Sequence, residues 1–316
     1  MIRTIFAAAA AVSLSGLAAL AEPAVVMAPG GAGGGYDATA RMPFEAMAAD
    51  GIFTDGATFT NKGGAGGTIG LAEFAGANQG NDNAVMSMGV IMVGGILLNN
   101  SPVTLDDVTP LVRLTNDTGV IAVATDSPIQ SVEDLVAAMK ADLGAVSIAG
   151  GSAGGVDHIV MALLAKEAGL DPAKINYIPQ ESGAESVVAV GGGAVMVAVS
   201  GISEFKPMAD AGRIKIIAVT SEGRVEGIDA PSLTEAGFPV VVGNWRGIVG
   251  APGMSDAGKA MWLDRFTRMH EGQAWKDILA KQGWEDAFLA GDEFAAFLDA
   301  EKERTAAVLK DLGLIQ

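Results

Sequence analysis

The chain has 316 residues, no cysteine, two histidines and a formal net charge of −17. The lack of cysteine excludes thiol nucleophiles, iron–sulfur clusters and thiolate zinc sites, and two histidines cannot form a multi-histidine metal site, so we expect no cofactor. The acidic charge repels nucleic acid and anionic membrane surfaces, and we expect neither as a partner. A chain of this length can bury a large core and form two lobes.

Residues 1–21 have the pattern of a secretory signal peptide. Arg3 supplies a positive charge, residues 5–20 form an Ala/Leu-rich run, and residues 19–21 read Ala-Leu-Ala, an A-x-A cleavage site. Serine and glycine interrupt the apolar run, which argues against a membrane helix. We therefore expect cleavage after Ala21 and an exported, soluble protein.

Strands and helices alternate through most of the remaining chain, which predicts an α/β fold. The expected strands cover residues 25–28, 58–61, 84–88, 120–124, 145–149, 175–178, 195–200, 214–219 and 240–249. The expected helices cover residues 37–48, 68–77, 131–142 and 154–168, a segment starting near residue 182, and then 256–270, 275–282 and 292–312. The methionines Met86, Met88 and Met92 are interpreted as core.

No long flexible linker divides the chain, so two lobes would be joined by ordinary strands. We expect the chain to cross between them near residues 120–125 and again near 219–224. This places residues 22–121 and 222–316 in lobe 1 and residues 122–221 in lobe 2.

Three glycine-rich turns, 29–37, 63–67 and 150–155, each follow an expected strand and begin a helix. Their free backbone N–H groups can hold a carboxylate or phosphate oxygen at close range. None fits G-x-G-x-x-G, and no G-x-x-x-x-G-K-[ST] occurs, which disfavours a nucleotide site. Ligands of open α/β sheets bind beyond the carboxyl ends of strands, so the three turns predict one shared cleft.

Ser152 has three interpretations. Residues 150–154 read Gly-Gly-Ser-Ala-Gly, which satisfies the G-x-S-x-G nucleophile elbow of a secreted serine hydrolase. Ser152 can instead bind an anion or cap its helix. The only downstream histidine, His270, lies in an amphipathic helix, and no HGGG-type oxyanion segment precedes the serine, so anion binding is favoured.

Several other residues have both structural and functional interpretations. Asp37 can favour its helix start through the helix dipole, or fix loop amides beside a ligand, and Arg41 lies at the i,i+4 position for an ion pair with it. His158 can bond a neighbouring loop or contact the ligand. Arg246 can hold a carboxylate through two parallel bonds or form an internal salt bridge.

Strand alternation constrains two further segments. Asn244 and Arg246 lie on one side of their strand and Trp245 on the other, so all three cannot line the cleft without a bulge. Ser87 faces away from its methionine neighbours and can point into the cleft.

Seven segments in order resemble a known family. They are APGGAGGGYDATAR (28–41), NKGGAGGTIG (61–70), GGSAGGVDH (150–158), SGISE (200–204), AGRIKIIAVTSEGR (211–224), PSLTEAG (231–237) and NWRGIVGAP (244–252). The set is similar to the solute-binding component of tripartite tricarboxylate transporters, the TctC or Bug family, and most similar to its tricarboxylate-binding branch. Two departures are Tyr36, where that branch commonly has Trp, and the run beginning at Ser182, where it tends to have GGGE.

The resemblance implies a periplasmic, type II-like binding protein with two α/β lobes, each a mixed sheet flanked by helices, around a cleft. It implies no enzyme activity, a small di- or tricarboxylate (citrate-like) ligand, permease subunits as membrane partners, and a monomer. A binding protein that feeds a sensor kinase is the remaining alternative. Together the loops and the resemblance predict these ligand-binding residues: Gly33, Gly34, Gly35, Tyr36, Asp37, Ser87, Ser152, Ala153, Gly154, Asp157, His158, Ser182, Asn244 and Arg246.

Overall fold

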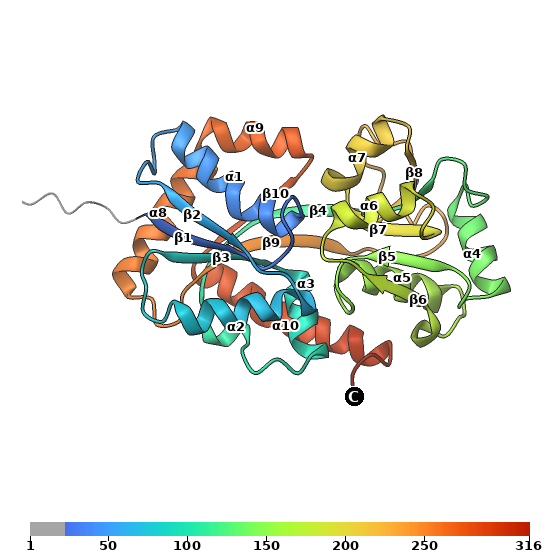
Figure 1. Ribbon diagram of the computed structural model, residues 1–316, viewed down its shortest axis with the longest axis horizontal. Helices are drawn as coiled ribbons and strands as arrows, with labels where there is room; N and C mark the ends of the chain where they lie inside the picture. The colour runs from blue at the N-terminus through green and yellow to red at the C-terminus, as the bar shows by residue number, and fades with distance from the viewer. Residues whose placement is uncertain (1–22) are drawn as a thin grey trace, which may run out of the picture.

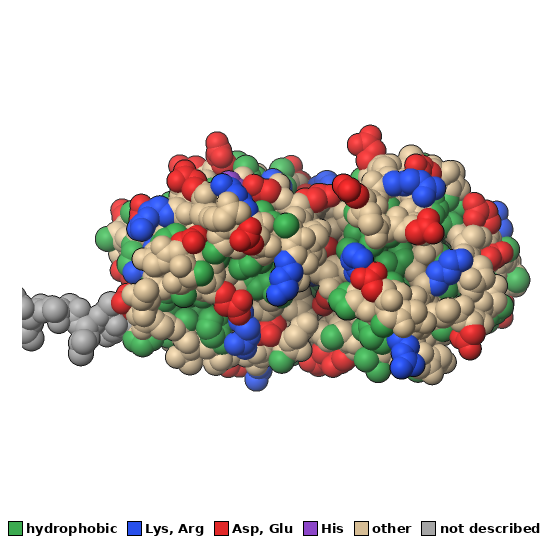
Figure 2. Space-filling view, turned by 90° about the horizontal axis from the view of Figure 1, so that it is seen from above, with side chains coloured by type: hydrophobic (Ala, Val, Ile, Leu, Met, Phe, Trp, Pro, Cys, Tyr) green, Lys and Arg blue, Asp and Glu red, His purple; other side chains and the backbone are tan. Residues whose placement is uncertain are grey.

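The computed structural model describes residues 23–316, and the expected signal peptide with its cleavage after Ala21 lies outside this range. The described chain forms ten α-helices and ten strands, arranged in two lobes side by side (Figure 1). This confirms the α/β class. In the view of Figure 2, acidic side chains are spread over both lobes, in keeping with the net charge of −17.

Lobe 1 contains the first strands and the C-terminal helices (Figure 1). Its sheet runs in the order β2-β1-β3-β9-β4, with β10 also paired to β4. Strands β1, β2 and β3 are mutually parallel, and β9 is antiparallel to both β3 and β4. The elements are β1 (Ala24–Ala28), α1 (Gly35–Ala49), β2 (Ala57–Asn61), α2 (Thr68–Ala77), β3 (Ala84–Gly89), α3 (Val90–Leu98), β9 (Gly243–Gly250), α8 (Asp256–Glu271), α9 (Gln273–Gln282), β10 (Glu285–Ala290) and α10 (Asp292–Asp311).

Lobe 2 continues from the same long strand, β4 (Thr109–Ala124), whose second half pairs with β7 and β8. Strand β5 is parallel to β6 and β7. The elements of this lobe are α4 (Val132–Ala141), β5 (Ser147–Gly150), α5 (Val156–Glu167), β6 (Asn176–Pro179), α6 (Gly183–Gly191), β7 (Val197–Gly201), α7 (Ile202–Asp210) and β8 (Ile214–Val219).

The return from lobe 2 to lobe 1 comes later than expected. Leu233 and Val240 pack into the hydrophobic core of lobe 2 with Ile217 and Ala218, so residues 222–242 belong to that lobe rather than to lobe 1. The chain crosses back as it enters β9, beside β4. The apolar side chains of residues 233–242 account for this, because they pack into the core of lobe 2.

Three elements were missed by the sequence patterns. Helix α3 reads VIMVGGILL, which is apolar all round and therefore has no helical periodicity. Helix α7 follows β7 directly and contains Pro207. Strand β10 interrupts the C-terminal third, which was expected to be helical, because it pairs with β4. The three methionines, Met86, Met88 and Met92, are fully buried, as expected.

Candidate functional site

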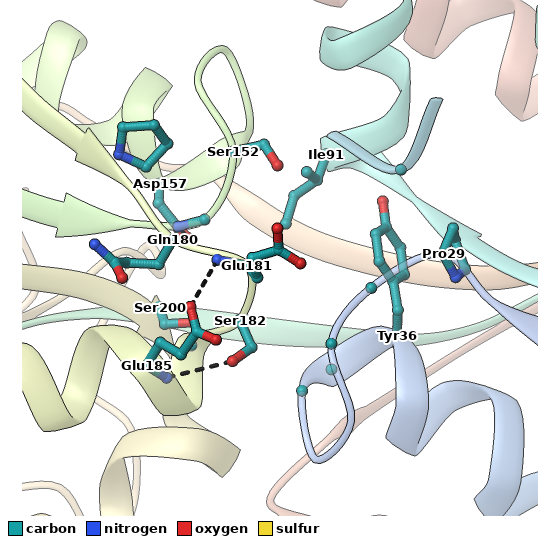
Figure 3. A pocket seen from close by; sticks show the side chains of 18 of the residues that line it. Pro29, Tyr36, Ile91, Ser152, Asp157, Gln180, Glu181, Ser182, Glu185 and Ser200 are labelled. Atoms are coloured by element: carbon teal, nitrogen blue, oxygen red, sulfur yellow. Dashed lines mark hydrogen bonds between the residues drawn. The ribbon is translucent and has the colours of Figure 1, made fainter. Parts of the chain in front are cut away.

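A cavity of about 520 Å³ lies between the lobes (Figure 3). Loops that follow strands β1, β2, β5 and β6 line it, together with the first turns of α1, α3, α5, α6 and α7, one residue each of β7 and β9, and Asn99 after α3. Its position beyond the carboxyl ends of parallel strands matches the usual ligand site of open α/β sheets. Eight of the predicted site residues line it: Gly34, Gly35, Tyr36, Ser152, Ala153, Asp157, Ser182 and Arg246.

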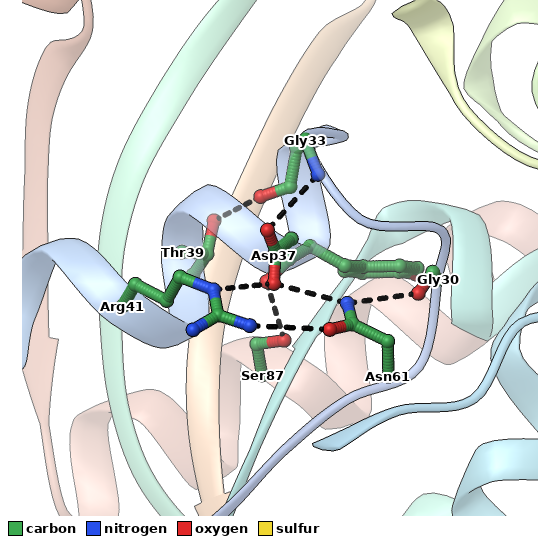
Figure 4. A network of polar contacts seen from close by, with 9 residues as sticks. Gly30, Gly33, Asp37, Thr39, Arg41, Asn61 and Ser87 are labelled. Atoms are coloured by element: carbon green, nitrogen blue, oxygen red, sulfur yellow. Dashed lines mark hydrogen bonds and ion pairs between the residues drawn. The ribbon is translucent and has the colours of Figure 1, made fainter. Parts of the chain in front are cut away.

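The loop of lobe 1 is held in shape by Asp37 (Figure 4). Its Oδ2 accepts a hydrogen bond from the backbone N–H of Gly33 (2.9 Å), and its Oδ1 accepts from Arg41 Nε (2.7 Å) and Asn61 Nδ2 (3.0 Å). Burial opposes ionisation of this carboxyl, but the bonds from Gly33, Asn61 and Arg41 outweigh it and lower its pKa. Asp37 therefore fixes the loop and does not line the cavity.

The loop of lobe 2 is held by Asp157 in a similar way. Its Oδ2 accepts from the backbone N–H of Gly151 (2.8 Å), no cation of the described residues 23–316 bonds it, and only 3% of the residue is exposed. Burial raises the pKa of Asp157 to about 7, with the Gly151 bond opposing the change and the Glu204 charge adding to it.

His158 also stabilises the lobe 2 loop. Its Nδ1 accepts from the backbone N–H of Gly154 (2.9 Å), and its ring stacks on Tyr177 at 4.4 Å between centroids. Burial lowers the pKa of His158 to about 4, so the ring is neutral at physiological pH. It lies outside the cavity lining, which supports its structural interpretation.

Among the described residues that line the cavity, Arg246 is the only basic one. The residue is 4% exposed, and its Nη1 has no hydrogen-bond partner within residues 23–316. The guanidinium lies against the Cα of Gly35, so a Cβ atom at this position would force the Arg246 side chain to move. Trp245 points to the other side of β9, where its Nε1 donates to Glu301, as strand alternation requires.

The two lobes touch through amides that the sequence suggested for ligand binding. The backbone N–H of Gly35 donates to Glu204 Oε1 (3.0 Å), and the N–H of Gly66 donates to Ser152 Oγ (2.9 Å). Glu204 Oε2 also accepts from Ser200 Oγ (2.6 Å). Side-chain oxygens of lobe 2 thus bind helix starts of lobe 1.

The remaining predicted residues lie away from the cavity lining. Ser87 is fully buried and donates to the backbone carbonyl of Tyr36 (2.9 Å), so it fixes the first turn of α1 and does not point into the cleft. Asn244 is 2% exposed and lies opposite Asp117 in the sheet. Gly33 and Gly154 instead shape their loops with φ angles of 78° and 73°.

Sequence reasoning missed six polar lining residues: Asn99, Gln180, Glu181, Glu185, Ser200 and Glu204. Glu204 is the last residue of the SGISE segment, which was noted as a family segment without a role for its carboxylate. Tyr36 lines the cavity, and its hydroxyl is buried near the backbone of Met92 without forming a hydrogen bond of good geometry. Burial raises the pKa of this phenol.

The hydrolase arrangement is not formed. Ser152 Oγ bonds the Gly66 amide, His158 bonds its own loop, and His270 Nε2 pairs with Asp286 Oδ2 at 2.8 Å, so neither histidine activates the serine. Within residues 23–316 no group of three or more His, Asp or Glu is placed to bind a metal ion. No helix in that range has the length and apolar character required to cross a membrane.

Two lobes that enclose a polar cavity at strand ends define the class of two-lobed binding proteins. The chain belongs to the family described as "Tripartite tricarboxylate transporter family receptor", TctC, whose model matches residues 46–314. Members of this family are periplasmic binding proteins rather than enzymes.

Two curated relatives show similar sequence identity over different lengths. Protein BugT of Bordetella pertussis is 26% identical over 299 residues, which cover 93% of this chain and 90% of BugT. The UPF0065 protein in the gbd 5′ region of Cupriavidus necator is 26% identical over 211 residues, or 66% of this chain. That match spans 63% of the relative's own length.

Solved structures share the fold. The periplasmic binding protein BugD has a TM-score of 0.83 at 22% identity, covering 93% of this chain and 98% of BugD. MatC from Rhodopseudomonas palustris, solved with bound malate, has a TM-score of 0.81 at 20% identity, covering 91% of this chain and 99% of MatC.

Proposed function

We propose that this protein binds a small organic carboxylate between its lobes and delivers it to the membrane permease of a tripartite tricarboxylate transporter. The family resemblance favours a di- or tricarboxylate, and the related fold of MatC holds malate. The cavity of about 520 Å³ lies within the range of roughly 300–1,000 Å³ that is usual for small-molecule sites.

The observation that supports this proposal most strongly is the unpartnered guanidinium of Arg246. A buried charge without a partner is costly, and a carboxylate is the group that fits a guanidinium best, through two parallel hydrogen bonds. A ligand carboxylate would supply the acceptors that the guanidinium lacks.

The contacts between lobes support a binding cycle that ends in closure. Gly35 and Gly66 of lobe 1 bond Glu204 and Ser152 of lobe 2, so the closed arrangement has direct contacts that an open one lacks. Closure joins surface from both lobes into one composite face, which a permease can distinguish from the open protein.

Calorimetry with citrate, isocitrate, tricarballylate, malate and succinate, together with their amino-substituted analogues, tests ligand binding. We expect at least one to bind and to raise the melting temperature by mass action. Arg246→Gln should weaken that binding at least ~30-fold, because one partner of a buried charge pair is lost. The matched control is Arg213→Gln, an exposed arginine between α7 and β8. Binding that survives Arg246→Gln unchanged would disprove this site.

Delivery to the permease needs its own experiment. Vesicles that contain the permease subunits should accumulate the ligand only when this protein is added, and Arg246→Gln protein should not support uptake. Uptake that is independent of the binding protein would argue against a transport role.

A further inference from the structure

A block of polar side chains lies on one face of β4 and β9, the two strands that cross between the lobes (Figure 1). Thr115 is paired with Arg246 and Asp117 with Asn244, so all four side chains share a face. Three of their polar atoms are buried without a hydrogen-bond partner among residues 23–316: Thr115 Oγ1, Asp117 Oδ1 and Arg246 Nη1. The block joins the cavity, which Arg246 lines, to the hinge between the lobes.

Asp117 is buried at the point where β4 passes from one lobe to the other. The next residue, Thr118, pairs with β9, and Gly119 pairs with β7 of lobe 2. Asp117 is 0% exposed, and its Oδ2 accepts a hydrogen bond from Ser203 Oγ of α7 (2.9 Å). A Cβ atom on Gly201 would stand 1.9 Å from the same oxygen, so the backbone of lobe 2 lies directly against the carboxyl. Its other oxygen, Oδ1, is the one left without a partner.

The charged groups around Asp117 are mostly negative. They are Arg246 of β9, Glu204 of α7, Asp157 of α5 and, on the opposite face of β4, Glu285 of β10, which bonds both neighbours of Asp117 in the strand. Burial raises the pKa of Asp117 to about 7, with Arg246 opposing the change and Glu204 adding to it. Because Arg246 is the strongest influence that favours the ionised carboxyl, the charge of Asp117 depends on what else the guanidinium binds.

We infer that Asp117 is a positioning residue that acts through Arg246: it takes up a proton from the solvent when a ligand carboxylate pairs with the guanidinium, and it returns the proton when the ligand leaves. This rests on the proposed function and makes ligand binding depend on pH. One guanidinium cannot neutralise two carboxylates at low solvent exposure. Protonation at Oδ1, the oxygen that accepts no hydrogen bond, removes the competing charge and leaves Arg246 to the ligand.

Asp157 is the other buried carboxyl that can change its charge near pH 7. Burial raises its pKa to about 7 as well, but there the Gly151 amide bond opposes burial more strongly than Arg246 does. That bond stays in place when Arg246 binds a ligand, so we assign the proton to Asp117. The nearby His158 and Tyr177 stay neutral, since burial lowers the pKa of His158 to about 4 and raises that of Tyr177.

The pH dependence of binding tests this coupling. Below pH 7 the free protein already holds the proton, so the affinity should change little, whereas above pH 7 each ligand must bring a proton with it, so the affinity should fall by up to about tenfold per pH unit. The probe is the tightest-binding acid among citrate, isocitrate, tricarballylate, malate and succinate, titrated by calorimetry from pH 6 to pH 9. At pH 8, where these acids are fully ionised, titrations in two buffers of different ionisation enthalpy should show proton uptake by the protein.

Three aspartate-to-asparagine variants locate the proton. Asp117→Asn keeps an acceptor for Ser203 and has the charge of the protonated acid. At pH 9 it should bind the probe about tenfold more tightly than the unsubstituted protein and without proton uptake, a gain that structural damage would not produce. Asp157→Asn should keep the proton uptake. Asp126→Asn, at an exposed position just beyond the end of β4, is the matched control and should behave like the unsubstituted protein.

The outcomes separate the role of Asp117 from the proposed function. An affinity that stays constant from pH 7 to pH 9 without proton uptake overturns the role of Asp117 and leaves carboxylate binding intact, and this measurement needs no variant. Proton uptake that Asp117→Asn keeps and Asp157→Asn loses also overturns it. If none of the five acids binds at any pH, the proposed function fails, and the role of Asp117 fails with it.

Discussion

The two glycine-rich loops that face each other across the cavity have the same local construction. In each, a glycine with positive φ, Gly33 (78°) or Gly154 (73°), is followed by an extended glycine that caps the next helix. In each, an aspartate of the first helical turn accepts a hydrogen bond from a loop amide. The backbone geometry therefore comes from the same short pattern of glycines and one acid.

The electrostatic environments of the two aspartates, Asp37 and Asp157, shift their pKa values in opposite directions. Asp37 has Arg41 and Asn61 as partners, and its pKa is lowered, whereas Asp157 is buried with no bonded cation, and its pKa is raised to about 7. One loop is a charge-paired scaffold, and the other presents a carboxyl to the cavity. The difference shows that the neighbours in space, and not the local sequence, decide how an acid at a helix start behaves.

The largest effect should come from keeping the lobe 2 loop away from helix α3 of lobe 1. A Cβ atom on Gly94 of α3 would stand 2.1 Å from the backbone oxygen of Gly154, so Gly94→Ala prevents the lobes from meeting. We expect ligand affinity to fall at least ~100-fold, about 2.7 kcal/mol, and the radius of gyration by X-ray scattering to increase. Gly76→Ala on α2, where a Cβ atom meets nothing within 4 Å, is the control and should change neither quantity.

The pH dependence of stability should come mainly from the lobe 2 side. Asp157 and Asp117 have folded-state pKa values of about 7, above the unfolded value of 3.8, so the folded state keeps protons that the unfolded chain has released. Stability should therefore fall as the pH rises from about 4 to 7, by up to ~1.4 kcal/mol per pH unit for each group. Asp157→Asn should flatten this slope in urea unfolding measured at several pH values. An unchanged slope would show that Asp157 is not the group responsible.

Replacing aspartate by asparagine in the lobe 1 loop should change the stability in the opposite direction from the same replacement in the lobe 2 loop. Asp37→Asn removes the ionic partner of Arg41 and weakens three hydrogen bonds, so we expect a loss of about 1–2 kcal/mol at pH 8. Asp157→Asn should instead stabilise the protein at pH 8, because it removes a buried charge. Thermal unfolding of both variants at pH 8 compares them directly, and shifts of the same sign would contradict the contrast between the loops.

The smallest effect should come from Ser152. Ser152→Ala removes the bond from the Gly66 amide between the lobes but no charge, so ligand affinity should fall about fivefold. The melting temperature without ligand should change little. Both proteins should lack esterase activity, and ester turnover that disappears in Ser152→Ala would instead support the hydrolase interpretation.

Much of the fold followed from local patterns. Helix α2 (Thr68–Ala77) and strand β8 (Ile214–Val219) have the predicted limits, because turn residues bound each of them. Helix α3 was missed since its apolar residues have no period, and residues 222–242 were assigned to the wrong side of the hinge since nothing local reveals which core they complete.

The candidate site was predictable only in part, because several of its contacts join residues that are far apart in the sequence. The glycine turns marked Gly34, Gly35 and Ser152 as cavity residues, but strand alternation alone could not place Ser87, which bonds the carbonyl of Tyr36 instead of facing the cleft. Glu204 could not be found from its own segment, because its role depends on an amide 169 residues away.

The sequence by itself determined most of the secondary structure, the glycine-rich helix starts and the family, since each is encoded in residues that are close together in the chain. Only the tertiary structure decided which charges are buried together. It left Arg246 Nη1 without a hydrogen-bond partner among residues 23–316, brought Asp157 and Glu204 into the lining of the same cavity, and used lobe 2 oxygens to bind lobe 1 amides. Burial and distance determine the strength of electrostatic interactions, and neither can be read from residues that lie far apart in sequence.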